Sequence, residues 1–189
     1  GSTSASSAVL RFNYTTFDAT ALAWEAYHCW LDWQNHIEAP SAKGLVHVNN
    51  IGMVMLEVPI ANFERTAMLF EQVGIEYEIA EADRLRELIP GIDTGRYWPP
   101  KQIDDPEFWE EASEQIRGMY TPQGGYVSDP MQSTVNLADA AIRKGAIFKY
   151  KTRVQEICKE GGRVCCVLTD SGEQINAGII AQAAGPCSG

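Results

Sequence analysis

The sequence predicts a fold that mixes helices and strands, in the α/β or α+β class, and three observations support it. Amphipathic runs at helical spacing alternate with short apolar runs over the first two thirds of the chain. The last third runs from a helix through a strand and a small meander to a final apolar strand, unlike a helical bundle. The 189 residues are 45% hydrophobic and 21% charged, a globular composition that allows one good core or two small ones.

Two helices and two strands are predicted before residue 80. Aromatic and apolar residues recur at helical spacing over residues 20–36, with Asp18 as the expected cap. Residues 51–58 form a short apolar run that predicts a buried strand. Asn62 is expected to cap a second helix that ends at Val73, before a glycine. Alternating apolar and polar residues over 75–79 then indicate a half-buried strand.

The middle of the chain is less regular. Residues 80–89 predict a short amphipathic helix, which the following Pro90 stops. Residues 96–98 predict a strand that ends at a pair of prolines. Residues 107–119 fit either a polar helix or an irregular excursion, and the pattern does not decide between them.

The last third contains one long helix and several strands. Residues 131–144 are amphipathic and are followed by a glycine, so they predict a helix. A strand over 146–150 follows, and Ile179-Ile180 begins the final apolar strand. Between them, glycine-containing turns separate three further predicted strands, at residues 153–158, 164–169 and 173–177.

Charge and hydropathy restrict the partners and the location of the protein. The net charge of -10 repels phosphate backbones, so we expect no nucleic-acid partner. No apolar run is long enough to cross a bilayer. The stretch from Gly1 to Ser7 lacks the basic end and the apolar run of a signal peptide, so we expect a cytoplasmic protein. The oligomeric state stays open.

The cysteines and histidines do not indicate a metal site. The five cysteines include no C-x-x-C pair, and Cys165 and Cys166 are adjacent, so on one strand they would point to opposite faces. We therefore expect free thiols in a reducing compartment. The three histidines show no metal-ligand spacing, and we expect no bound metal.

Five stretches in a fixed order carry a family resemblance. They are a Ser-rich loop that runs into Val9-Leu10-Arg11, the helix end Glu87-Leu88-Ile89-Pro90, the segment 125–130 before the long helix, the segment 153–157, and the closing segment 179–188. Together they resemble the D-amino-acid oxidase/sarcosine oxidase group of FAD enzymes, whose members oxidise amines and amino acids. The resemblance touches nearly the whole chain.

The resemblance implies a domain organisation. Residues 1–45 and 125–189 would form part of an FAD/NAD(P)-binding, Rossmann-like domain, and residues 46–124 part of an antiparallel-sheet substrate domain. The family's opening G-x-G-x-x-G, which places a helix N-terminus against the pyrophosphate, is absent from these 189 residues. We therefore expect an internal fragment of a longer enzyme that does not hold FAD tightly by itself. Gln182 and Cys187 also depart from the residues common in the family.

The resemblance also implies site residues. Arg11 would lie near the flavin ring as the catalytic cation, an interpretation that we favour over a surface cation or a structural salt bridge. Val154 would offer its main chain to the adenine, but it could also be an ordinary core valine. Small residues near position 184 would let the backbone approach the cofactor, or they could end a strand packed under a helix. The implied cofactor-binding residues are Ser4, Ser6, Ser7, Val154, Ala183, Ala184 and Gly185.

The chemistry implied by the resemblance is hydride removal from the carbon beside an amine. The substrate would be a small-molecule amine or an N-methyl or ordinary amino acid, and FAD would accept the hydride. The family's covalent-flavin variants carry a histidine in the Ser-rich loop, where this chain has none, so we expect non-covalent FAD. An FAD-dependent dehydrogenase of a hydroxy acid or glycerol phosphate is an alternative, as is a folded fragment without catalytic activity. No hydrolase motif or P-loop is present.

Overall fold

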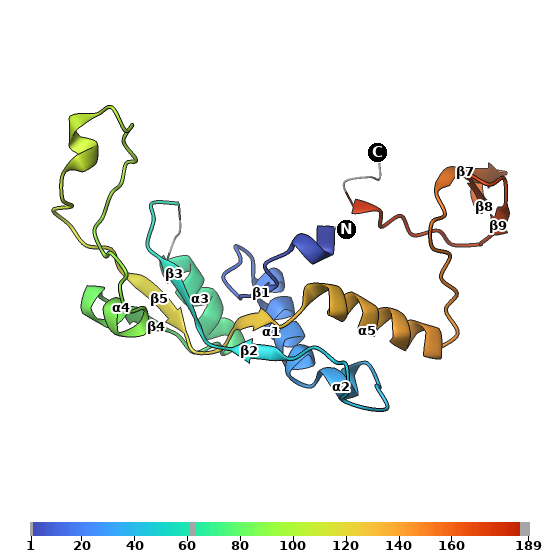
Figure 1. Ribbon diagram of the computed structural model, residues 1–189, viewed down its shortest axis with the longest axis horizontal. Helices are drawn as coiled ribbons and strands as arrows, with labels where there is room; N and C mark the ends of the chain where they lie inside the picture. Colours follow the sequence, from blue (N-terminus) through green and yellow to red (C-terminus); the bar gives the residue numbers. More distant parts are fainter. Residues whose placement is uncertain (1, 61–62, 186–189) are drawn as a thin grey trace. The chain divides into compact units, whose positions relative to one another are not determined.

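The computed structural model describes residues 2–60 and 63–185 of the chain, drawn in Figure 1. It divides into two compact units, Gly1–Arg143 and Lys144–Gly189. Every strand pair among the described residues is antiparallel, and helices accompany the strands, which confirms the mixed class. No helix in these residues is long and apolar enough to span a bilayer. The assignment of residues 46–124 to a substrate domain stays a prediction.

Of the elements formed by the described residues, the first unit holds all the helices and two of the three sheets. Its helical elements are η1 (Ser2–Ala5), α1 (Phe17–Leu31), α2 (Trp33–His36), α3 (Phe63–Val73), α4 (Ala82–Leu88), η2 (Pro106–Trp109) and α5 (Pro130–Arg143). Its strands are β1 (Val9–Leu10), β2 (Val48–Asn50), β3 (Met53–Leu56), β4 (Glu78–Ala80), β5 (Gly118–Thr121) and β6 (Gly125–Val127). One sheet has the order β1-β6-β2 and the other β3-β5-β4.

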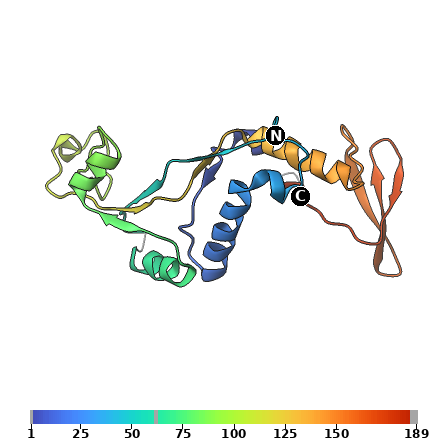
Figure 2. The same cartoon turned by 90° about the horizontal axis from the view of Figure 1, so that it is seen from below.

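The two sheets of this unit share one long antiparallel ribbon. Residues 48–56 pair with residues 118–127 in both sheets, and Figure 2 shows the two segments running side by side. The register shifts where one sheet gives way to the other, and there the Gly52 N–H donates to the Gly124 carbonyl at 3.2 Å. Both glycines have positive φ, +76° and +106°, which side-chain-bearing residues rarely adopt.

The core of the first unit is aromatic. Phe12, Tyr27 and Phe70 are buried together with Ile75 and Met119. The rings of Phe12 and Tyr27 meet edge to face, with their centroids 5.3 Å apart, the arrangement that aromatic quadrupoles favour. The helical stripe of aromatic residues predicted from the sequence therefore serves packing.

A second buried cluster connects α2, β6 and α5. Trp33, Val46 and Val127 pack in it. The side-chain oxygen of Asn136 accepts from the Trp33 indole at 3.3 Å and from the Val46 N–H at 3.1 Å. Its amide nitrogen donates to the Gly44 carbonyl at 3.0 Å, so both polar atoms of this buried side chain have partners.

The predicted helices are confirmed, with two changes at the first one. Thr16, not Asp18, caps α1: its hydroxyl accepts from the Ala19 N–H, and Asp18 lies in the first turn, where a negative charge also favours the helix. The helical segment breaks at Asp32, so α1 and α2 are separate. The predicted cap Asn62 lies outside the described residues.

Between α4 and β5 the chain makes a long loop instead of the strand predicted at 96–98. Within the part of the chain that the structure describes, a single bridge, Gly95 with Gln115, closes the base of this loop, and beside it the Arg96 N–H donates to the Glu114 carbonyl at 2.8 Å. With no second bridge the segment forms no ladder. Residues 107–119, left open by the sequence, are irregular apart from η2 and the start of β5.

The second unit is a three-stranded meander. Its strands β7 (Val154–Glu160), β8 (Arg163–Thr169) and β9 (Gln174–Asn176) pair in chain order, as predicted. Gly161 and Gly162, both with positive φ, form the tight turn between β7 and β8. The strands predicted at 146–150 and at Ile179-Ile180 are not formed, because neither segment pairs with another strand among the described residues.

Candidate cofactor-binding site

A cavity of about 440 Å³ in the second unit brings together three of the predicted cofactor-binding residues. Val154 lines it from the start of β7, and Ala183 and Ala184 line it from the segment that follows β9. The remaining walls are Gln155, Glu156, Ile157, Val167, Ile180, Ala181 and Gln182. Its volume is within the range of small-molecule pockets, and only one of its lining residues is acidic.

Val154 presents its main chain to the open side of the sheet. β7 is the edge strand of the described sheet, and Val154 lies opposite Thr169 on β8. Beside this pair the Asp170 N–H donates to the Arg153 carbonyl at 2.8 Å, the pattern that flanks a non-hydrogen-bonded pair. The N–H and C=O of Val154 itself therefore face away from β8. The register shift between Val154 and Glu156 leaves Gln155 as a bulge on the same strand.

The small residues after β9 differ in what they do. Ala183 and Ala184 are exposed and line the cavity, so their main chain is accessible from solvent. Gly185 does not line it. Its φ is +60°, a left-handed conformation that gives a local reason for glycine there. The predicted close approach to a cofactor stays a prediction, as it does for Ala183 and Ala184.

The other predicted residues belong to the first unit, in the loop around η1. Ser4, Ser6 and Ser7 are exposed, and the Ser6 hydroxyl accepts from the Ala8 N–H at 3.0 Å. Ala8 has a φ of +53°, a conformation that costs an alanine about 1 kcal/mol or more. Sequence reasoning missed Ala8, because nothing in its neighbours signals a left-handed backbone. The Ala8 carbonyl accepts from the Val127 N–H at 3.0 Å, which fixes the loop against β6.

Arg11 is exposed and keeps its charge available. Its guanidinium carbon lies 5.4 Å from the centre of the Tyr14 ring, in cation–π distance. It forms no ion pair with any residue that the structure describes, so the alternative of a structural salt bridge finds no support there. Its place beside a flavin stays a prediction.

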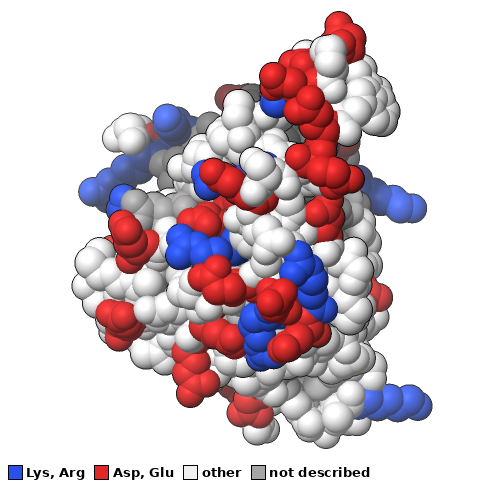
Figure 3. Space-filling model, turned by 90° about the vertical axis from the view of Figure 1, so that its left-hand side faces the viewer, with Lys and Arg blue, Asp and Glu red and all other residues white. Residues whose placement is uncertain are grey.

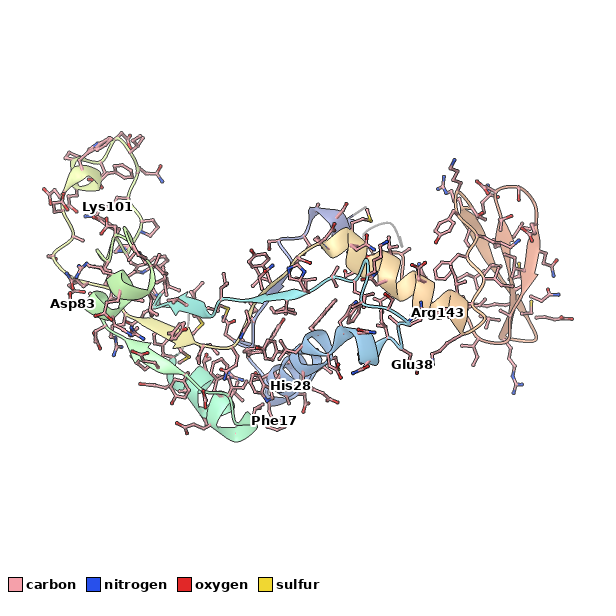
Figure 4. The ribbon with its side chains drawn as sticks, turned by 60° about the horizontal axis from the view of Figure 1, so that its bottom comes forward. Phe17, His28, Glu38, Asp83, Lys101 and Arg143 are labelled. Carbon is pink, nitrogen blue, oxygen red and sulfur yellow. The ribbon has the colours of Figure 1, made fainter. Side chains whose placement is uncertain are left out.

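A larger cavity, of about 630 Å³, lies in the loop between α4 and β5, and none of the predicted site residues lines it. Tyr97, Trp98 and Phe108 contribute rings to it, and Glu110 and Glu111 contribute carboxylates. Figure 3 shows acidic side chains interspersed with basic ones on this side of the first unit, and Figure 4 labels Lys101 on the loop. Arg96 and Lys101 also line the cavity beside three glutamates, so its charge is mixed and does not single it out for the diphosphate of a dinucleotide.

The described residues contain no group of His, Cys, Asp or Glu side chains arranged to hold a metal ion. The described cysteines are free thiols: Cys29, Cys158, Cys165 and Cys166. Cys187 lies outside the described residues.

The described residues thus form a mixed fold with a cavity beside a free strand edge, and sequence comparison specifies the family. The chain matches the DAO family, described as FAD dependent oxidoreductase, over residues 1–189, and it belongs to that family. FAD is therefore the cofactor of the family to which the chain belongs. A comparison with curated proteins found no match.

Solved structures share the fold over nearly the whole chain. L-proline dehydrogenase from P. horikoshii aligns with a TM-score of 0.76 at 18% identity, covering 100% of this chain and 44% of its own. Glycine oxidase from Geobacillus kaustophilus aligns with a TM-score of 0.67 at 18% identity, covering 94% and 43%. L-amino acid deaminase from Proteus vulgaris aligns with a TM-score of 0.57 at 16% identity, covering 93% and 37%. The chain thus spans less than half the length of these enzymes.

Proposed function

We propose that the protein carrying this chain oxidises the C–N bond of an amine or amino acid, with FAD as its non-covalent hydride acceptor. The observation that carries the proposal is the fold likeness over 100% of the chain to an enzyme named for L-proline oxidation. Membership of the FAD dependent oxidoreductase family supports the redox class. The names of the glycine oxidase and the L-amino acid deaminase, which share the fold, support an amino-acid substrate.

The residues of the second unit suit the adenosine end of FAD. The outward-facing N–H and C=O of Val154 offer one donor and one acceptor, which matches the hydrogen-bonding edge of an adenine. The side chains of Ala183 and Ala184 are short, so a flat ring can approach the main chain of this wall of the cavity. A volume of about 440 Å³ suits this end of the cofactor rather than the whole of it.

In the first unit, Ser4, Ser6 and Ser7 supply hydroxyls and amides to phosphate or flavin atoms in this proposal. Arg11 supplies a positive charge where negative charge develops on the ring system during the reaction. Its exposed guanidinium, without an ion pair among the described residues, is free to take that role. Placement of the donor carbon against the acceptor atom then accounts for most of the rate, with little acid–base apparatus needed.

Anaerobic reduction tests the reaction class. The purified protein that carries this chain is mixed without oxygen with L-proline, glycine or N-methylglycine, and in parallel with lactate or glycerol 3-phosphate. We expect bleaching of the flavin absorbance with at least one amine donor, and release of the flavin into the filtrate on denaturation. Bleaching by the hydroxy donors alone would move the protein to the alternative substrate class. A flavin that no donor bleaches contradicts the proposed reaction.

Substitutions that remove or keep the positive charge of Arg11 test its role. We expect Arg11→Ala to slow flavin reduction or reoxidation by about tenfold or more, equivalent to ~1.4 kcal/mol, with the FAD content unchanged. Arg11→Lys, which keeps the charge, retains most of the rate. Stopped-flow absorbance measures both half-reactions. Equal rates in the alanine variant and the unaltered protein remove Arg11 from the site.

A further inference from the structure

Two cysteines lie directly opposite each other on neighbouring strands of the second unit. Cys158 on β7 pairs with Cys166 on β8. On the other side of β8, the Ala177 N–H donates to the Cys165 carbonyl at 2.9 Å, so Cys166 and Asn176 form a non-hydrogen-bonded pair. The N–H and C=O of Cys166 therefore face β7, and its pair with Cys158 is of the hydrogen-bonded type. The Cα atoms of such a pair lie about 5.5 Å apart, within the range that disulfides span.

A third thiol lies beside this pair. The register shifts from Cys158 opposite Cys166 to Lys159 opposite Val164, which leaves Cys165 as the extra residue of a bulge. The bulge breaks the strict alternation of side chains, so the expectation that Cys165 and Cys166 point apart is wrong. Their Sγ atoms lie 4.0 Å from each other.

We propose that Cys158 and Cys166 form a redox-active dithiol, which closes to a cross-strand disulfide when the protein meets hydrogen peroxide. In the first step the Cys158 sulfur attacks the peroxide, becomes a sulfenic acid and releases one water. In the second step the Cys166 sulfur displaces the hydroxyl from that sulfenic acid, and its proton leaves with the hydroxyl as a second water. Two thiols lose two electrons in total, and one peroxide is reduced to two waters.

The surroundings of the two thiols set the order of these steps. Cys166 is only 3% exposed, whereas Cys158 is half-buried. The hydrogen bond with the Cys158 thiol, followed by burial, raises the pKa of Cys166 to about 12. Because the thiolate is the reactive form, Cys166 is the poorer first nucleophile and acts as the resolving thiol.

The bond is expected to be reversible. Opposite Cβ atoms on neighbouring strands lie about 4.5–5.5 Å apart, whereas a relaxed disulfide holds them near 3.8 Å. Closing the bond therefore draws the strands together, and a disulfide formed under such strain is easily reduced.

Peptide mapping tests the proposal directly. The reduced protein is treated with hydrogen peroxide, its remaining thiols are alkylated, and it is digested with trypsin, which cleaves after Lys159 and Arg163. We expect the peptide that ends at Lys159 to be joined to the peptide that begins at Val164, with two of the five thiols lost. Dithiothreitol should restore both thiols.

Serine variants identify the partner thiol, because Cys165, Cys166 and Cys187 share one tryptic peptide: the sequence has no lysine or arginine between Val164 and Gly189. Cys165→Ser, Cys187→Ser and the control Cys29→Ser should keep the link, whereas Cys158→Ser and Cys166→Ser should abolish it. A link that survives Cys166→Ser, a link to Cys187, or peroxide treatment that yields no link would overturn the assignment. Far-UV circular dichroism confirms that each variant is folded, and the test does not depend on flavin binding or turnover.

Discussion

The two units of the chain are held together in different ways. In the first unit, large side chains such as Phe12, Phe70 and Met119 are buried to 1% exposure. In the second unit, the buried described residues are Cys166 and Thr169, and the exposed apolar residues include Ile147 and Ile179, at 87% and 89%. Hydrophobic burial therefore dominates in the first unit, while the main-chain ladder of β7, β8 and β9 gives the second its form.

Because of this difference, side chains determine stability in the first unit, whereas main-chain hydrogen bonds determine it in the second. Where side chains fill a core, removing one leaves a cavity, and the cost is large. Where a ladder of main-chain hydrogen bonds with an exposed edge holds the strands together, substitution of a side chain costs little stability. The unpaired main-chain N–H and C=O groups at that edge can then bind a ligand. The candidate cofactor site lies in the second kind of region, and substitutions can test whether this contrast holds.

The largest effect is expected in the aromatic core. Phe70→Ala should lower the free energy of unfolding of the first unit by about 4 kcal/mol, because the cavity cannot close around it. Ile179→Ala in the second unit should change stability by less than about 0.5 kcal/mol, since its side chain is exposed. All five tryptophans precede residue 143, so tryptophan fluorescence in urea reports on the first unit, and hydrogen exchange of the β7–β9 amides reports on the second. Equal losses of stability in the two variants, each measured in its own unit, would contradict the contrast.

Gly125 tests the sheet of the first unit. It lies in the central strand β6 at a φ of +145°, and an added Cβ would lie 2.0 Å from the Asn49 carbonyl oxygen. Gly125→Ala should therefore cost about 3 kcal/mol through overpacking and backbone strain. Gly74→Ala is the matched control: its φ is +85°, but nothing lies within 4 Å of the added atom. We expect about 1 kcal/mol there, and equal losses would show that the close contact relaxes.

Local patterns in the sequence predicted the helices and the meander. The periodicity of residues 63–73 and 130–143 and the glycine turn at 161–162 each lie within one short segment, so their neighbours in the chain suffice. The short strands β2 and β6 were missed, because their partners are distant: β6 pairs with β1 and β2, which precede it by more than 70 residues. Strand length alone could not reveal such pairs.

Three predicted strands failed for the same physical reason. Residues 96–98, 146–150 and Ile179-Ile180 have strand-like composition, but a strand needs a continuous ladder with a partner, and the single bridge beside Arg96 does not extend into one. The candidate site came from family resemblance rather than from spacing. That Val154 faces outward depends on the register with Thr169 and on the bulge at Gln155, which no residue pattern encodes.

Substitutions of Val154 test whether the main chain of the second unit, rather than a side chain, binds the cofactor. If the main chain of β7 recognises the adenine, Val154→Pro, which removes one N–H, should weaken FAD affinity about fivefold, or ~1 kcal/mol. Proline is tolerated at the first residue of a strand, so the meander should persist. Val154→Ala keeps the N–H and should change the affinity less than about twofold. Titration of the flavin-free protein with FAD, followed by flavin fluorescence, measures both. A clear loss of FAD affinity in Val154→Ala would show that the side chain, and not the main chain, contacts the cofactor.

The smallest effect concerns a surface ion pair in the first unit, between the residue that follows β3 and the residue that precedes β5. The Arg117 guanidinium donates two hydrogen bonds to the Glu57 carboxylate, at 3.1 and 2.6 Å. The side-chain hydrogen bond from Arg117 lowers the pKa of Glu57 below its ordinary value of 4.5. Folding therefore favours the charged carboxylate, and the pair contributes its full stability above that ordinary value. The contribution disappears as the pH falls through the lowered pKa in the folded state.

Glu57→Gln isolates this contribution, because glutamine keeps the shape of the side chain and loses the titration. We expect the unaltered protein to have the higher midpoint of thermal unfolding at neutral pH, with the gap narrowing below about pH 4.5. The gap should also narrow in high salt, since both partners are partly exposed. Tryptophan fluorescence again follows the first unit alone. A gap that stays constant from neutral to acid pH would mean that glutamine is disfavoured through packing, and that side-chain fit governs even the surface of this unit.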